Sequence, residues 1–287
     1  MVTPQLEWRG AVGTRTWRIA ASALLGLSGL SLPFILALVL VASDPPVTPP
    51  LLLRLFVALS VLPAIAGHLL LRARTSSISV GASELALRGS GLTIEVPARA
   101  IDRIRPWIVP LPGPGFSVQL RSGQWLRYGI VTDDPFAILS VLGRECQCDA
   151  AASAARHPLV TWAHARATYG RASPAALFLK FVIFALAPTA VLFNAHQHIS
   201  FGGLLGQWNI VSPLAWLQTL VEYWLTLIVY LVLYAGVVRG IVELALVAVS
   251  WIRAAAAHGA RRAGEVACQV LYYAGVPALV GLRFLDW

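Results

Sequence analysis

Charged residues are scarce in this chain. Of its 287 residues only 12% are Asp, Glu, Lys or Arg, whereas 57% are hydrophobic. Soluble globular domains carry about 25% charged residues, so this composition excludes a chain that is soluble throughout. The formal net charge is +9. Because the basic residues stand mostly at the ends of apolar segments, where they fix membrane orientation, we expect no nucleic acid among the partners.

Cysteine is also rare. The chain has Cys146, Cys148 and Cys268, and an odd number without regular spacing excludes a disulfide-stapled domain. The first two are separated by one residue, which is not the CxxC spacing of zinc and thioredoxin-type sites. We interpret Cys146 and Cys148 as two thiols at a helix end in a reducing compartment.

Familiar catalytic motifs are missing as well. The sequence contains neither a serine nucleophile elbow nor an HExxH pair. Gly202, Gly203 and Gly206 lie close together but without the GxGxxG spacing or the strand–helix context of a nucleotide site. Because these motifs are absent, we predict no cofactor. Whether the protein is an enzyme stays open.

Long apolar segments dominate what is present. About 20 apolar residues suffice to cross the hydrocarbon core of a bilayer. Five segments reach that length: residues 20–42, 51–71, 175–194, 214–238 and 266–285. Basic residues precede the first of them, as in a signal peptide, but its apolar run is too long for a cleaved signal, so we expect a retained anchor.

Basic residues also predict the orientation of these segments. The region before the first one carries Arg9, Arg15 and Arg18, whereas the loop 43–50 and the stretch 195–213 contain neither Lys nor Arg. By the positive-inside rule the N-terminus is cytoplasmic and those two loops are external. The polar region that follows the second segment is then cytoplasmic.

The number of spans depends on residues 241–252. This apolar run of about twelve residues is short for a span and contains Glu243. We expect the fourth helix to continue through it, with Trp251 and Arg253 at the membrane boundary, which gives five spans and an external C-terminus. Six spans with a cytoplasmic C-terminus are the alternative, and Arg283 fits it better.

Residues 76–131 differ in kind from the rest. Short alternating runs are separated by Gly- and Ser-containing turns, which is typical of β-strands. The expected strands are 77–80, 84–88, 92–96, 116–120 and 125–130. An acidic cap and Pro135 then indicate a helix start. A curved sheet of about five to seven strands, closed by one helix, is the fold that we predict.

These patterns predict four regions along the chain. Residues 1–74 form a cytoplasmic N-terminus with two transmembrane helices, and 75–146 form a cytoplasmic β-rich domain. Residues 147–173 are expected to be a linker or amphipathic segment, and 174–287 a membrane domain with three or four helices.

The β-rich region resembles bacterial PH-like domains. The similarity lies in residues 92–97 (LTIEVP) with 100–104 (AIDRI), and in 128–130 (YGI) with 134–136 (DPF). The placement after two membrane helices is also similar to membrane-anchored members of that group. The resemblance implies no catalytic motif. It implies a scaffold or interaction role in the bacterial inner (cytoplasmic) membrane.

The sequence departs from that family at residues 107–115, where closely spaced prolines make a stiff loop. The loop is either a recognition surface or a rigid connection between strands. Nearby Arg99, Arg103, Arg105 and Trp107 form a candidate contact with the membrane surface or with a partner. Ordinary solvated arginines are the alternative.

The densest polar cluster lies at the external end of the third span. It consists of His196, Gln197, His198 and Asn209, with Glu222 in the fourth span. An ionisable residue inside a membrane is costly and is therefore a functional hypothesis. A metal held by the two histidines and Glu222 requires that the helix has ended, because residues i and i+2 point apart on a helix. Interfacial polar groups are the alternative.

We therefore expect an α-helical polytopic membrane protein with a small β-rich, PH-like cytoplasmic insert. Its expected role is a scaffold or adaptor that assembles or regulates a membrane complex. The bilayer, other membrane proteins or further copies of the chain are the expected partners. The alternative is a membrane enzyme or transporter with a metal- or proton-handling site at the external cluster.

Overall fold

The computed structural model describes residues 6–41, 47–81, 83–89, 91–169, 172–278 and 281. Contacts within the chain divide it into two compact units. The first, here called the sheet unit, comprises Met1–Ser28, Leu62–Gly170 and Glu243–Gly264. The second, here called the helical unit, comprises Gly29–Val61, Arg171–Val242 and Glu265–Trp287.

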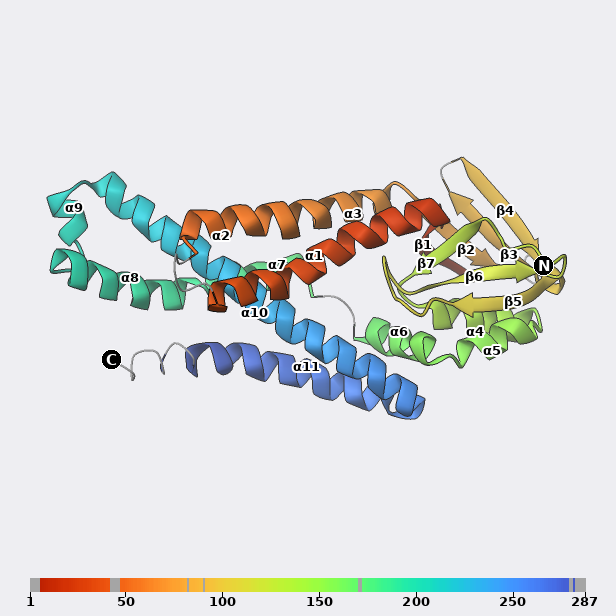
Figure 1. Ribbon diagram of the computed structural model, residues 1–287. Helices are drawn as coiled ribbons and strands as arrows, with labels where there is room; N and C mark the ends of the chain where they lie inside the picture. The colour runs from red at the N-terminus through yellow and green to blue at the C-terminus, as the bar shows by residue number, and fades with distance from the viewer. Residues whose placement is uncertain are drawn as a thin grey trace. The chain divides into compact units, whose positions relative to one another are not determined.

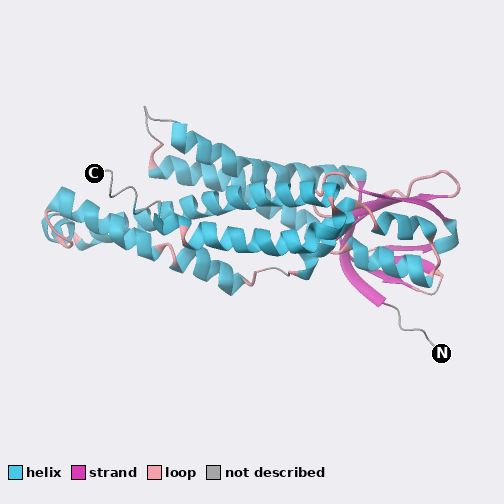
Figure 2. Ribbon diagram, turned by 90° about the horizontal axis from the view of Figure 1, so that it is seen from below, coloured by secondary structure: helices cyan, strands magenta, loops and turns pink. Residues whose placement is uncertain are grey.

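The sheet unit contains a curled antiparallel sheet of seven strands (Figures 1 and 2). The strands are β1 (Leu6–Thr14), β2 (Thr75–Val80), β3 (Glu84–Gly89), β4 (Leu92–Pro97), β5 (Ile101–Pro106), β6 (Gly115–Leu120) and β7 (Tyr128–Thr132). Their order in the sheet is β4-β3-β2-β1-β7-β6-β5. The predicted curved sheet of about five to seven strands is therefore present. Strand β5, one of its two edge strands, was not among the expected strands.

Strand β1 is an addition to the predicted fold. It precedes the first apolar helix, yet it lies in the middle of the sheet, with Leu6 opposite Val80 of β2 and Gly10 opposite Thr132 of β7. A Cβ atom at Gly10 would lie 2.5 Å from the carbonyl oxygen of Val131, so this close approach requires glycine. The sheet thus combines a strand that precedes the first two apolar helices in the sequence with strands that follow them.

Three helices complete the core of the sheet unit, whereas one closing helix was predicted: α4 (Pro135–Glu145), α5 (Asp149–Ala155) and α6 (Pro158–Thr168). Asp134 caps α4 by accepting a hydrogen bond from Ala137 N at 3.2 Å, and Pro135 occupies the first turn, as predicted. Buried residues of the sheet and of all three helices form one apolar cluster. Helices α5 and α6 occupy the region where a linker or amphipathic segment was expected.

Four helical segments among the described residues are long and apolar enough to cross a membrane. They are α1 (Arg15–Val41), Pro49–Arg72, Pro174–Phe201 and α10 (Pro213–Ile252). The second comprises α2 (Pro49–Phe56), η1 (Val57–Val61) and α3 (Leu62–Arg72), and the third comprises α7 (Pro174–Phe178), η3 (Leu179–Ile183) and α8 (Leu186–Phe201). The prediction of membrane-type helices is confirmed in these segments, and α10 continues through 241–252 as expected.

The fifth predicted span overlaps α11 (Ala257–Tyr273), which follows the short helix η4 (Ala254–Ala256). Helix α11 has 17 residues and starts with a polar stretch, so it falls short of the about 20 apolar residues that a span requires. Residues 279–280 and 282–287, which include Arg283, lie outside the described residues. A fifth span and the side of the C-terminus therefore stay predictions.

The helical unit is held together by two apolar clusters. One joins Ile35 and Leu52 with Val229 and Leu233, and the other surrounds Tyr272. The η1 and η3 segments are single π-helical turns. In η1 the buried Ser60 hydroxyl is 2.6 Å from that of Ser31 on α1, and such a bond between helices satisfies both polar groups.

Candidate functional site

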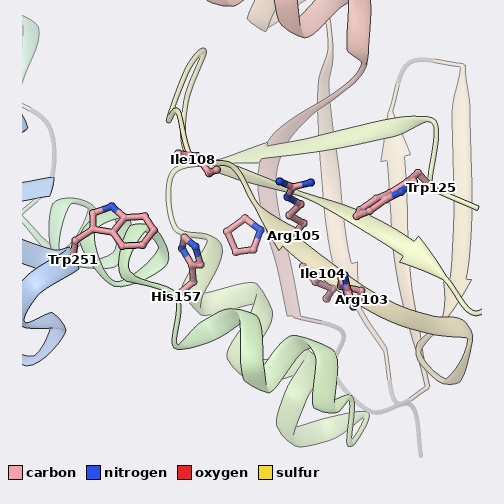
Figure 3. Close-up of a pocket in the computed structure, with 8 residues that line it drawn as sticks. Arg103, Ile104, Arg105, Ile108, Trp125, His157 and Trp251 are labelled. Atoms are coloured by element: carbon pink, nitrogen blue, oxygen red, sulfur yellow. The ribbon is translucent and has the colours of Figure 1, made fainter. Parts of the chain in front are cut away.

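A pocket of about 350 Å³ lies in the sheet unit beside the edge strand β5 (Figure 3). Arg103 and Arg105 line it from β5, and His157 and Trp251 line it from the start of α6 and the end of α10. The remaining lining residues are Ile104, Pro106, Ile108 and Trp125. We call this the basic–aromatic pocket.

The alternation of β5 accounts for the two arginines. Ile104 is buried in the core while Arg103 and Arg105 on either side of it are exposed. Because side chains of a strand alternate between its faces, residues i and i+2 point the same way. Both guanidinium groups therefore lie on the same face of β5. Each can donate two parallel hydrogen bonds to a carboxylate or phosphate.

His157 is fixed by the helix that it begins. Its Nδ1 accepts a hydrogen bond from Leu159 N at 3.3 Å, so the ring caps α6. The ring also meets Trp251 edge-on, with 5.4 Å between centroids, and Figure 3 shows it between Trp251 and the arginine-bearing strand. Burial lowers the pKa of His157 below its ordinary value. The positive charge of the pocket at neutral pH therefore comes from the arginines.

Two half-exposed indoles complete the pocket. Trp251 is 52% exposed and Trp125 45%, although tryptophan normally buries most of its surface. Trp125 is held by a β-bridge to Gln119 of β6. Exposed tryptophan beside arginine is the composition of binding surfaces rather than of ordinary protein surface.

The other two residues of the predicted surface contact lie elsewhere. Arg99 is exposed on the short helix η2 (Ala98–Ala100) and does not line the pocket. Trp107 is half-buried and its Nε1 donates a hydrogen bond to Ser117 Oγ at 2.9 Å. The Trp107 ring also lies against the backbone of β6 and β7, because a Cβ atom at Gly115 or Gly129 would come within 2.7 Å of it. These contacts hold the start of the loop 107–114 on the sheet.

The predicted external cluster lies in the helical unit. Its residues differ in burial and in the groups that they contact. Helix α8 runs to Phe201, so His196, Gln197 and His198 are helical. The His196 ring packs on Tyr223 at 5.3 Å between centroids, whereas His198 Nδ1 is 2.9 Å from the carbonyl oxygen of Asn194. The helix has not ended at the two histidines, so the condition for a joint metal site is not met.

Gln197 is the buried member of this cluster. Its Nε2 donates to Gln207 Oε1 at 2.8 Å, and its Oε1 accepts from Gln207 N at 3.3 Å. Gln207 in turn donates to Thr219 Oγ1 at 3.0 Å. This amide relay ties α8 to α9 (Gly206–Ile210) and α10. Gln197 is thus a structural residue that satisfies backbone and side-chain polar groups.

Asn209 and Glu222 are exposed. Glu222 lines a second, mainly apolar hollow of about 390 Å³ in the helical unit, together with Pro49, Leu53 and Leu217. Among the described residues no three His, Cys, Asp or Glu side chains are grouped so that they could hold a metal ion. Hydrogen bonds and the exposed carboxylate of Glu222 are the polar features that the structure shows at this cluster.

A third polar group was not predicted from the sequence. Lys180 is the only lysine of the chain and lies on the π-turn η3. Its Nζ is 4.3 Å from the centroid of the Tyr272 ring, and the Tyr272 hydroxyl donates to the Lys180 carbonyl oxygen at 2.6 Å. Arg239 forms two hydrogen bonds with Glu265, at 2.6 and 2.8 Å. A lone lysine within an apolar segment is the signal that could have found this group.

Comparison of the chain with protein-family models, with curated proteins and with solved structures finds no match.

Proposed function

We propose that the protein is a multi-pass adaptor of the bacterial inner membrane, and that its sheet unit is a cytoplasmic PH-like module. In this proposal the module binds an acidic segment of a partner protein and so assembles or regulates a membrane complex. The observation that carries the proposal is the meeting of Arg103, Arg105, His157 and Trp251 around one pocket.

The charges of the pocket select the ligand. Arg103 and Arg105 are two residues apart on β5, about 7 Å along the strand. Carboxylates at alternate residues of an extended peptide have the same spacing, so each guanidinium can meet one carboxylate. The indoles of Trp125 and Trp251 offer an apolar anchor beside these charges.

The architecture supports a binding role. Four membrane-type helices accompany a folded sheet unit, and the curled sheet of seven strands followed by α4 is compatible with the PH-like resemblance of residues 92–136. The basic residues that flank the apolar helices favour a cytoplasmic position for this unit. A membrane-anchored domain of this kind positions a partner at the membrane without chemistry of its own.

The test is photo-crosslinking in native membranes from benzoylphenylalanine placed at Trp125 of the full chain. We expect one protein adduct of defined mass, weakened by high salt because the contact is electrostatic. The double variant Arg103→Glu, Arg105→Glu should reduce the adduct at least tenfold. Arg99→Glu removes an equally exposed arginine outside the pocket and should leave it unchanged.

Other outcomes contradict the proposal. Adducts with lipid alone would assign the pocket to anionic headgroups. An adduct that survives the double charge reversal would show that the arginines do not recognise the partner.

A further inference from the structure

We infer that the loop 108–112 inserts into the headgroup–acyl boundary of the same leaflet that the first helix enters. This membrane contact differs in its occupant from the basic–aromatic pocket, with which the loop shares Ile108 at its base. These residues are the central part of the connection 107–114 between β5 and β6, and Figure 3 shows Ile108 at its base. Its outward side chains are apolar, with Ile108 63%, Val109 61% and Leu111 37% exposed.

The position of the loop along α1 gives its depth. A Cβ atom at Gly26 would lie 3.8 Å from Leu111 Cδ1, so Leu111 touches α1 at that level. The apolar part of α1 begins near Ala20, and six residues of helix correspond to about 9 Å. Interfacial segments bury their apolar side about 5–10 Å into the boundary region. Leu111 therefore lies at the depth where apolar side chains enter lipid.

A second contact fixes the loop against the same helix. The guanidinium of Arg18 lies over the Trp107 ring, with its carbon 4.4 Å from the ring centroid. Trp107 N also donates to the carbonyl oxygen of Gly115 at 3.0 Å, which closes the base of the loop. The loop is thus held beside α1 at two levels, and its exposed apolar residues keep a fixed height relative to that helix.

The prolines lower the free-energy cost of placing this loop near lipid. Non-helical backbone is costly there because unpaired N–H groups lose their water. Pro110 and Pro112 have no N–H, so two of the five residues of the loop lack this liability, and Pro114 follows just beyond it. Apolar side chains with few backbone donors are what an inserted loop requires.

The test measures the depth of residue 109 in the full chain in lipid nanodiscs. Val109→Cys, in a background without the three natural cysteines, carries an environment-sensitive fluorophore. We expect a blue-shifted emission, strong quenching by lipids with a spin label close to the headgroup, and little quenching by aqueous iodide. Ser122→Cys is the matched control at the other end of β6, and it should show the reverse.

A second measurement uses the chain without substitutions or fluorophore. In the unmodified chain, lipids with a photoreactive group in the upper acyl chain should label the peptide that contains Ile108 and Val109 but not the one that contains Ser122. Equal iodide access at positions 109 and 122 would overturn the inference. So would protection of position 109 from iodide without quenching by lipid, because that pattern means burial against protein.

Discussion

The guanidinium carbon of Arg18 lies 4.4 Å from the centroid of the Trp107 ring, so the start of the first membrane helix is joined to the sheet by a cation–π contact. Trp107 adds a hydrogen bond to Ser117. The indole therefore connects α1, the loop after β5 and strand β6. This contact places the sheet next to the N-terminal end of α1.

Replacing Trp107 by Leu should destabilise the sheet unit. The substitution removes the ring, its hydrogen bond and the Arg18 contact, and the loss should be about 1–3 kcal/mol, because the ring is half-buried and leucine keeps part of the apolar contact. Arg18→Gln should cost only about 0.5–1 kcal/mol, since it removes the cation–π contact alone. Chemical denaturation followed by circular dichroism measures both. Trp125→Leu is the control, and an equal loss there would contradict this role for Trp107.

The stability of the sheet unit should fall as the medium becomes acidic. Burial lowers the pKa of His157, so the folded state favours the neutral ring, whose Nδ1 accepts the N–H of Leu159. The unfolded state binds its proton near the ordinary pKa of about 6.5. The contribution of His157 is then complete above about pH 6.5 and is lost as the pH falls through the lowered pKa.

The variant His157→Asn keeps a side chain that can cap α6 but removes the titratable ring, so it separates the two contributions of His157. Asparagine is a good N-cap and does not titrate, so the variant should keep the stability of the parent near neutral pH and lose less of it in acid. Melting temperatures of both proteins at neutral and acidic pH measure the difference. Identical pH profiles of parent and variant would show that His157 is not the titrating group.

The parts of the fold that depend on local pattern could be predicted from the sequence. Hydrophobic length alone indicated the four membrane-type helices, and Asp134 with Pro135 marked the start of α4. Strand β1 could not be predicted in this way. Its partners β2 and β7 lie on the far side of two helices in the sequence, and its pairing is a property of the whole sheet.

In the candidate sites, too, features that depend on local sequence could be predicted, and features that depend on long-range contacts could not. Arg103 and Arg105 were predicted as contact residues from their charge, whereas His157 and Trp251 join them only through folding, because they come from distant segments. Gln197 was grouped with its histidine neighbours. Successive residues of a helix are rotated by about 100°, so neighbours in sequence face different surroundings.

Gln197 and His198 should respond differently to the same substitution. Gln197→Leu removes the hydrogen bonds that Gln197 makes with the backbone N–H and with the side-chain Oε1 of Gln207. The loss should lower the free energy of unfolding by about 1–3 kcal/mol. His198→Leu changes an exposed side chain and should stay within about 0.5 kcal/mol. Unfolding of the full chain by a denaturing detergent compares the two variants. Equal losses would show that the relay does not stabilise the helical unit.

Arg239 and Glu265 should be energetically coupled. Their two hydrogen bonds are short and parallel, and each group is partly shielded, with side chains 38% and 29% exposed. Arg239→Met or Glu265→Met leaves the other charge without its closest partner and should cost about 1.5–3 kcal/mol. The double variant removes both charges and should lose less than the two single losses combined, because no stranded charge remains. Arg262→Met, at an exposed position of α11, should have little effect. Detergent-induced unfolding of the three variants and this control gives the coupling energy, and single losses that simply add would show that the two groups act independently.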